Sequence, residues 1–366
     1  NLLYTSKTDP KNLSYTTSAN YLVLKVKSDS NDILSGSGYH LVLTPNNVIF
    51  TNANIQQAVI DWTSDPVAAK NTYGHISNWN TSQVTNMHGL FSEKTNFNDN
   101  INNWNVSNVT TMREMFYNCN NFNQPLNSWI VSNVEDVTLM FYQCNNFNQP
   151  LNNWTLNKVT SMQSLFYNCT LFNQNLNSWD VSNVNNISSL FFGCNSFNQP
   201  LNNWNTSNVT KMNQLFRACN NFNQDITTWN VSNVNNTSAM FLGCNAFNQD
   251  LSSWNVSNVT NMTNMFRNTN IFNGNIATWD VSNVTSMKDM FNNAKQFNQN
   301  LNSWITNNVI QMDGMFRSAN VFNGNITTWD VSNVTNMRGM FRDANSFNQD
   351  LSCLLYTSPS PRDSAL

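Results

Sequence analysis

Residues 254–266 read WNVSNVTNMTNMF, and 25 residues further on residues 279–291 read WDVSNVTSMKDMF. The copy before them, residues 229–241, reads WNVSNVNNTSAMF. A segment that returns at a fixed interval of 20–50 residues is typical of a solenoid, a propeller or another repeat array. The spacing and content of these copies therefore decide the fold class.

The repeat is regular along most of the chain. Trp stands at every 25th position from Trp79 to Trp329, eleven times in all and without an insertion. Other invariant or nearly invariant columns with the same spacing begin at Val84, Phe91, Phe97 and Asn98. A unit of 25 residues is short for a propeller blade or a helix pair, and it fits one coil of the leucine-rich-repeat type.

Each unit contains two hydrophobic patterns. Spacing of i, i+3, i+4 and i+7 predicts one face of a short helix, and it occurs at Met112, Met115, Phe116 and Cys119. Ser107 or Asn108 could cap the start of such a helix. The spacing L-x-x-W-x-V at residues 126–131 indicates a strand. We therefore expect an α/β fold, a leucine-rich-repeat-like solenoid of about eleven strand-turn-helix coils.

The segments outside the repeats suggest further units. Residues 51–75 predict a helical cap, since Ile55, Ala58, Val59 and Trp62 have helical spacing and Pro66 suits the start of a second helix. Residues 1–50 contain YLVLKV and YHLVLTPNNVIF, which predict a β-rich and truncated N-terminal segment. The solenoid domain is expected over residues 76–352. Residues 353–366, CLLYTSPSPRDSAL, break the pattern and are interpreted as a non-native, adapter-like tail.

With these columns in view, the chain resembles the repeats of BspA-like, mycoplasma-type surface proteins, whose core reads F-N-x-x-[IL]-x-x-W-[DN]-V-S-N-V-T-x-M-x-x-M-F. Residues 247–266, FNQDLSSWNVSNVTNMTNMF, contain almost the whole motif, and the resemblance covers about residues 51–352. It implies a leucine-rich-repeat-like solenoid on a secreted or cell-surface protein, with a role in adhesion or partner binding. It carries over no catalytic residue.

Composition argues against several function classes. Charged residues make up 10% of the chain and the net charge is −3, without a basic run that would predict nucleic-acid binding. No apolar run of about 18 residues predicts membrane insertion. The three His show no metal-ligand spacing, and no nucleotide-binding motif occurs. We therefore expect no cofactor, no metal and no enzyme activity.

One pair of carboxylates keeps an enzymatic alternative open. Asp280 and Asp330 occupy the same column two coils apart, or about 10 Å at a strand spacing of about 4.8 Å. That separation suits an inverting pair of a carbohydrate-active enzyme. The intervening Ile305 leaves the pair without polar surroundings, so this alternative is the weakest.

Two polar or reactive columns have structural explanations. The Asn column from Asn98 to Asn348 is expected to pair backbone groups from coil to coil, with ligand contact as the alternative. A Cys column contains Cys119, Cys144, Cys169, Cys194, Cys219 and Cys244. It could form a disulfide ladder, as in an extracellular chain, or a row of free buried thiols. Other units place Thr or Ala there, and a bridge needs Cα atoms within about 7 Å, so free thiols are favoured.

The column after the first Phe of each unit varies in an ordered way. A helix would turn it about 100° from the core, and aromatic residues are followed there mostly by basic ones. The candidate binding surface is Tyr117, Tyr142, Tyr167, Phe192, Arg217, Arg267, Arg317 and Arg342. Tyr could contact sugars or protein, and Arg could bind carboxylate or phosphate. The alternative is boundary packing combined with solubility.

These observations predict a non-catalytic, extracellular or cell-surface module. It would bind or adhere to a protein or glycan along the solenoid surface, as a monomeric array. A structural spacer or stalk is the first alternative, and the carbohydrate-active enzyme is the second.

Overall fold

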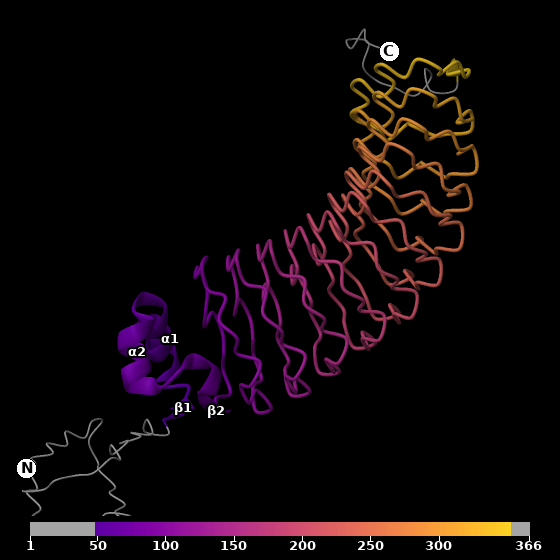
Figure 1. Ribbon diagram of the computed structural model, residues 1–366. Coiled ribbons are helices and arrows are strands. Elements are labelled where there is room, and N and C mark those ends of the chain that lie inside the picture. Colours follow the sequence, from indigo (N-terminus) through magenta and orange to yellow (C-terminus); the bar gives the residue numbers. More distant parts are fainter. Residues whose placement is uncertain (1–47, 353–366) are drawn as a thin grey trace, which may run out of the picture.

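The computed structural model describes residues 48–352, which form a curved solenoid with a helical cap at one end (Figure 1). The predicted β-rich segment, apart from residues 48–50, and the predicted adapter-like tail lie outside the described residues. The elements in chain order are β1 (Ile49–Thr51), α1 (Ile55–Ser64), α2 (Pro66–Tyr73), the 3-10 helix η2 (Ile76–Asn78) and β2 (Asn80–Gln83). Strands β1 and β2 pair in parallel.

The cap closes the first end of the hydrophobic core. Helix α1 buries all four residues of its predicted apolar face, and Asp65 accepts hydrogen bonds from the first N–H groups of α2. Trp62 packs edge-on against Trp79 with ring centroids 6.0 Å apart, and its indole N–H donates to Asp99 at 2.9 Å. Phe50 stacks on the same Trp79 at 4.5 Å. The first member of the Trp column is thus kept from water.

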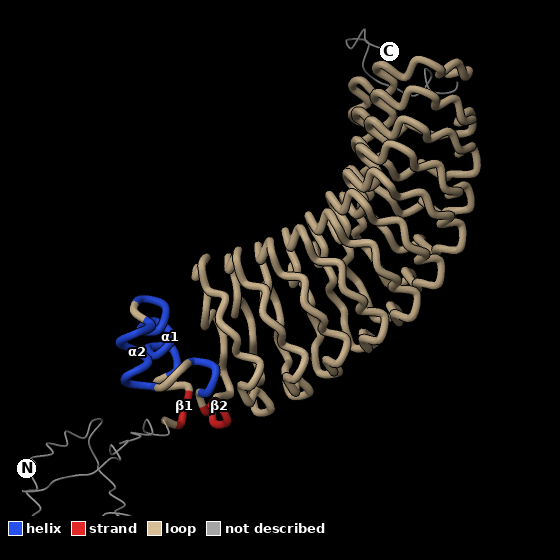
Figure 2. The backbone as a smooth tube through the Cα atoms, in the orientation of Figure 1, coloured by secondary structure: helices blue, strands red, loops and turns tan. Residues whose placement is uncertain are grey.

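The coils themselves contain turns and short extended stretches. Between residues 84 and 351 the described chain has no helix and no strand beyond isolated parallel bridges (Figure 2). The predicted strand-turn-helix composition of the coil is therefore wrong, and so is the capping role of Ser107, whose N–H instead bonds Asn105 Oδ1 in a local turn. The repeat solenoid is present, but its coil is built differently.

Left-handed backbone explains why no helix forms. In every unit two columns have positive φ; one runs from Gly89 to Gly339 and the other from Glu93 to Asp343. Met115 and Tyr117 each close an i to i+3 turn, on Met112 and Glu114. The left-handed residue then reverses the winding before a second helical turn can follow. The i, i+3, i+4, i+7 pattern is thus produced by successive turns that bury the same side chains.

This reversal directs alternate N–H groups toward the next coil. In one unit the N–H groups of Met112, Glu114, Phe116 and Asn118 donate to the carbonyls of Asp136, Thr138, Met140 and Tyr142 at 2.7–3.0 Å. The same ladder recurs along the solenoid, for example from Phe266 to Met290 and from Phe291 to Met315. The segment predicted to be helical therefore carries the hydrogen bonds that stack the coils. The segment predicted to be a strand makes such a bond in only two coils, from Leu251 to Asn275 and from Leu301 to Asn325.

On the other side of the coil, side chains make most of the links. Each Asn Oδ1 of the column from Asn98 to Asn323 accepts the backbone N–H of the next Asn in the column, at 2.7–3.0 Å. The expected pairing role of this column is confirmed. The indole N–H of Trp129 likewise reaches the carbonyl of Ile101, and every Trp further along repeats this bond.

The two sides have different spacings, and this accounts for the bend. Rings of the Phe91 column lie 5.5–5.9 Å apart from coil to coil. Neighbouring Trp rings lie 5.9–6.5 Å apart. Rings in the column that starts at Tyr117 are only 4.1–4.7 Å apart. Since a backbone ladder holds chains about 4.8 Å apart, the ladder side is the inner side of the arc.

The Cys column lies in the core. All six thiols are free and buried, as favoured from the sequence, and each donates to a Phe carbonyl in the preceding coil, Cys144 to Phe116 at 3.0 Å for example. Burial raises the pKa of each thiol, that of Cys119 to about 12 and those of the other five well above their usual value. These cysteines are therefore packing residues with little thiolate character.

A matched pair of substitutions tests the left-handed column. Ala218 has φ 60°, between Gly193 and Gly243 of the neighbouring coils. We expect Ala218→Gly to stabilise the solenoid by about 1 kcal/mol, because glycine adopts this conformation without strain. Gly243→Ala should cost about the same, since a Cβ there would meet only ordinary contacts of 3.7 Å or more. Urea unfolding midpoints measure both, and shifts of the same sign would contradict the left-handed assignment.

The buried thiols predict alkaline unfolding. Above pH of about 8.5 the unfolded thiols lose protons while the folded ones keep them, so the unfolded state is favoured as pH rises. The triple change Cys144→Ala, Cys169→Ala and Cys194→Ala should flatten the fall in stability by up to about 4 kcal/mol per pH unit. Alanine already occupies this column at Ala294. Urea midpoints between pH 8 and pH 11 test this, and unchanged slopes would exclude the thiols as the cause.

Candidate functional site

The candidate residues lie in one line on the inner side of the arc. Tyr117 and Tyr142 stack with ring centroids 4.7 Å apart and planes at 6°. Tyr142 and Tyr167 stack at 4.5 Å, and Tyr167 stacks on Phe192 at 4.1 Å. All four side chains are half-buried. The structure thus joins these residues into one continuous stack of rings, which we call the aromatic ladder.

A cation closes the far end of the aromatic ladder. The guanidinium carbon of Arg217 lies 4.9 Å from the centroid of the Phe192 ring, a distance typical of a cation–π contact. The Nη1 of Arg217 also donates to the side-chain oxygen of Gln214 at 3.1 Å. The last ring face is therefore covered by a charge from the next coil.

Stacking determines which parts of the rings a ligand can reach. Both faces of Tyr142 and of Tyr167 are covered by neighbouring rings, so their edges and hydroxyl groups are what remains. Phenols are already protonated at neutral pH, and burial raises the pKa of Tyr117 and Tyr167 further. These hydroxyls can therefore donate hydrogen bonds. The ladder can present a row of phenol groups, one per coil, to a partner.

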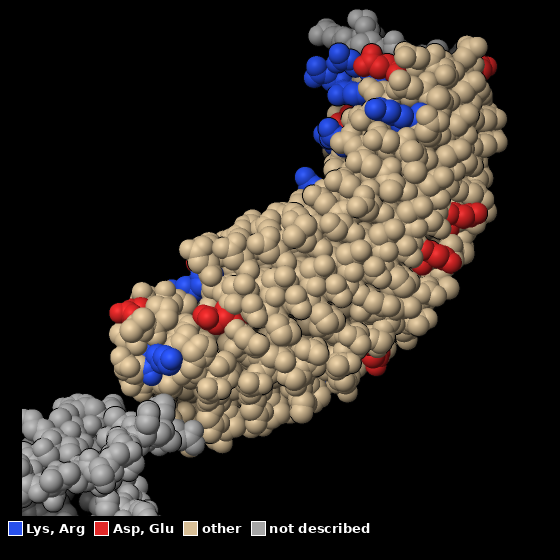
Figure 3. Space-filling model, in the orientation of Figure 1, with Lys and Arg blue, Asp and Glu red and all other residues tan. Residues whose placement is uncertain are grey.

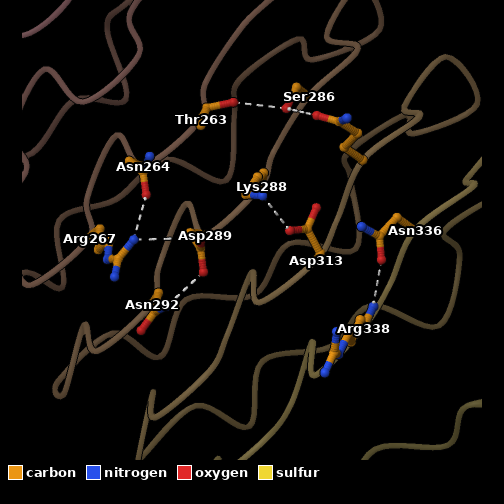
Figure 4. A network of polar contacts seen from close by, with 11 residues as sticks. Thr263, Asn264, Arg267, Ser286, Lys288, Asp289, Asn292, Asp313, Asn336 and Arg338 are labelled. Carbon is orange, nitrogen blue, oxygen red and sulfur yellow. Dashed lines mark hydrogen bonds and ion pairs between the residues drawn. The ribbon is translucent and has the colours of Figure 1, made fainter. Parts of the chain in front are cut away.

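Beyond Arg217, the same column contains Leu242 and Asn292 as well as the basic candidates Arg267, Arg317 and Arg342. Arg267 lies between Asn264, which accepts its Nη1 at 3.3 Å, and Asp289, whose carboxylate is 3.6 Å away (Figure 4). Asp289 thus partly neutralises the charge of Arg267 within the protein. Nearby, the ammonium group of Lys288 pairs with the Asp313 carboxylate of the next coil at 2.9 Å.

Arg317 and Arg342 lie in the last coils. The Nε of Arg317 is buried and has no hydrogen-bond partner among the described residues, and its Nη2 lies over Gly339, where a Cβ would come within 2.9 Å. Arg342 is exposed and reaches Asp343 only at 3.7 Å. Of the two, the guanidinium of Arg342 is the one that is exposed to an external anion.

Charge separates across the coil in the C-terminal half. We call the part of each unit from the Val of the Val84 column to the second Phe, residues 209–222 for example, the turn segment. Within residues 211–352 every basic side chain stands on this segment, at Lys211, Arg217, Arg267, Lys288, Lys295, Arg317, Arg338 and Arg342. The rest of the unit, from the second Phe to the next Val, is the Trp segment. It carries five acidic residues, Asp225, Asp250, Asp280, Asp330 and Asp350, whereas three others, Asp289, Asp313 and Asp343, stand on the turn segment. Figure 3 shows the basic side chains gathered along the inner edge of this half and acidic ones along the outer edge. The inner face there attracts anions.

The Asp280 and Asp330 carboxylates are held separately. Each accepts the N–H of the serine two residues ahead, Ser282 or Ser332, at 2.9–3.0 Å. For Asp280, hydrogen bonds from Ser282 lower the pKa, and those from Ser332 lower that of Asp330. Both groups are therefore anionic at neutral pH. Within residues 48–352 no group of three or more His, Cys, Asp or Glu side chains could hold a metal ion.

Sequence reasoning did not select the residues at the near end of the aromatic ladder. Ser92 precedes Tyr117 in its column, and Glu93 and Glu114 occupy the left-handed columns beside it. The sequence did contain one indication of this end of the ladder, namely the change from Ser92 to Tyr117 between the first two units. The second left-handed column could also have been found from its many Asn, Gly and Asp residues, the types that adopt positive φ most readily.

Fold and surface together define a tandem-repeat solenoid with a ridge of aromatic and basic residues on its inner face. The chain belongs to the family described as "Mycoplasma protein of unknown function, DUF285", which matches residues 60–179, 160–279 and 268–358. None of the curated proteins matches the chain.

One similar solved structure is the Toll–Spatzle complex of Drosophila, in its glycosylated form, with 12% identity and a TM-score of 0.25. The match covers 66% of this chain and 35% of that one, so it spans about a third of the Drosophila chain. No helix in the part of this chain that the structure describes is long and apolar enough to cross a membrane.

The contribution of ring stacking to stability can be measured separately from that of the tyrosine hydroxyl groups. Tyr142→Ala removes a ring that contacts two others, and we expect a loss of about 1–3 kcal/mol, from two pair contacts of about 0.5–1.5 kcal/mol each. Tyr142→Phe keeps both contacts and should change the urea midpoint little. Equal losses for the two variants would show that the hydroxyl group, rather than the stack, stabilises the protein.

Proposed function

We propose that this chain is a non-catalytic recognition module of an extracellular or cell-surface protein, which binds its ligand along the inner face of the arc. The observation that carries the proposal is the aromatic ladder from Tyr117 to Phe192, half-buried and continuous over four coils. Packing inside the core does not need this column to be aromatic, because later coils hold Arg, Leu or Asn there.

A protein ligand fits this surface better than a sugar stacked along it. Sugar rings stack on exposed aromatic faces, whereas the faces of Tyr142 and Tyr167 are covered by their neighbours. Phenol edges and hydroxyls with nearby arginines resemble the composition of protein interfaces, where Tyr and Arg are enriched. Each coil would add a small contribution, and the rigid stacking avoids the entropy cost of ordering these side chains on binding.

The surface location rests on the resemblance of the repeat to BspA-like proteins. The main competing function is a spacer that holds another domain at a distance, which would use the same stacked core and leave the ridge without a partner.

Three hydroxyl deletions test the proposal with the stack left intact. The variant Tyr117→Phe, Tyr142→Phe and Tyr167→Phe should lose at least about tenfold in affinity, since each lost hydrogen bond contributes about 0.5–1.5 kcal/mol. Wild type is first screened on arrays of extracellular proteins and of glycans, and affinities for the hits are then measured by biolayer interferometry.

The control variant carries Thr155→Ala and Asn203→Ala, two exposed positions on the Trp segment. It should bind like the wild type. Absence of any ligand on either array, or equal affinity for the triple variant and the wild type, would favour the spacer.

A further inference from the structure

The two ends of the aromatic ladder differ. At the far end Phe192 is covered by the guanidinium of Arg217, 4.9 Å from the ring centroid. At the near end the residue stacked before Tyr117 is Ser92, which is too small to cover a ring. Gly89, the first of the two left-handed residues of that coil, has no side chain, and a Cβ built there would meet only Ser92 Cβ at 3.9 Å. One face of Tyr117 is therefore open.

Acceptor groups surround the open face. The backbone N–H of Glu93 bonds the Tyr117 carbonyl at 2.7 Å, which fixes Glu93 beside the ring. Its carboxylate takes one hydrogen bond, from Asn118 Nδ2 at 3.0 Å, and the side chain is exposed. The Oδ1 of Asn118 is buried and has no partner among the described residues. Of these two acceptors, the exposed Glu93 carboxylate is the one that a ligand at the end of the aromatic ladder can reach.

Charged groups of both signs lie at this end of the aromatic ladder. Glu114 stands on the same turn and pairs with Arg113 at 3.1 Å. Glu93 has no ion pair within the described residues, and it also lines a hollow of about 280 Å³ between the cap and the first coil, together with Lys94, Thr63 and Pro66. The negative charges of Glu93 and Glu114 contribute to the raised pKa of Tyr117, after burial and Tyr142. The Glu93 carboxylate is therefore available to pair with an arriving cation.

From this geometry we propose that the open face of Tyr117, with Glu93 and Asn118, is a site for the guanidinium group of an arginine on a partner protein. The group would stack on the ring as Arg217 stacks on Phe192, and its N–H donors would reach the exposed Glu93 carboxylate, which Asn118 Nδ2 holds in place. Guanidinium groups combine a flat face with several in-plane donors, which suits this combination better than a compact ammonium. The site deepens the proposed function and rests on it for its biological partner.

A short peptide tests the site without the partner. The probe is acetyl-Gly-Arg-Gly-amide, titrated into protein labelled with ¹³C in its Tyr rings, with Tyr117→Phe used to assign the Tyr117 signal. We expect a saturable shift of the Tyr117 ring signal. The same peptide with citrulline, which has the shape of arginine without its charge, should bind at least about fivefold more weakly, as expected for loss of a cation–π contact.

Two substitutions at one position give matched controls. Ser92→Phe should extend the aromatic ladder by one ring and abolish the peptide shift, while its thermal midpoint shows that the protein still folds. Ser92→Ala leaves the face open and should keep the shift. Glu93→Gln should weaken binding by about fivefold, in line with loss of a charge-assisted contact.

Several results would overturn the site. These are equal binding of the citrulline peptide, a Tyr117 response to methyl-β-galactoside in place of the arginine peptide, and a shift that persists in Ser92→Phe. Self-association seen by sedimentation, and lost in Ser92→Phe, would assign the face to a second copy of this chain. The titration uses no natural ligand, so this site and the proposed function can fail separately. If the peptide does not bind while a ligand from the array still depends on the three hydroxyls, only the arginine site is wrong. If the peptide binds but no array ligand is found, only the proposed function is wrong.

Discussion

The backbone ladder on the turn segment is the interaction on which the rest of the structure depends. Alternate N–H groups of one coil donate to the carbonyls of the next, and two left-handed residues in each unit make this possible. The ladder brings the coils closer on this side than on the Trp side, where the rings are 5.9–6.5 Å apart. The bend, the inner face and the tight stacking of surface rings follow from that difference.

The wider side explains why the chain is so rich in Asn. Where coils diverge, a direct backbone bond is out of reach for most groups, and an unpaired buried amide is costly. An Asn side chain spans the gap, as Asn98 does for the N–H of Asn123 and Asn133 does for the carbonyl of Ser107. Serine and threonine hydroxyls and the indole N–H groups do the same. Many polar residues that the sequence alone would place on the surface therefore hold neighbouring coils together through hydrogen bonds.

The sequence predicts side-chain positions better than backbone conformation. Columns of Trp, Val and Phe could be assigned to the core because invariance at a 25-residue interval requires each residue to contact its own counterpart. The helix could not be excluded, because Met112, Met115, Phe116 and Cys119 are buried by turns as they would be by a helix. Only the backbone of Glu114 and Asn118 separates the two cases. The candidate ridge depended on side-chain direction alone, so its residues were found, whereas the contribution of Ser92 required knowing that the rings stack.

Invariant residues in a stacked array carry no information about a ligand, since the same contact has to be made in every coil. Information about a ligand can reside only where the coils differ and the side chain reaches solvent, and the ridge column meets both conditions. A row of stacked rings in that column has two terminal faces, each with a cost if left to water. The chain covers one of them with Arg217 and places Ser92 and Gly89 at the other. Because an aromatic side chain at Ser92 would have covered that face, the asymmetry points to the near end of the ladder as the place where an outside group completes the stack.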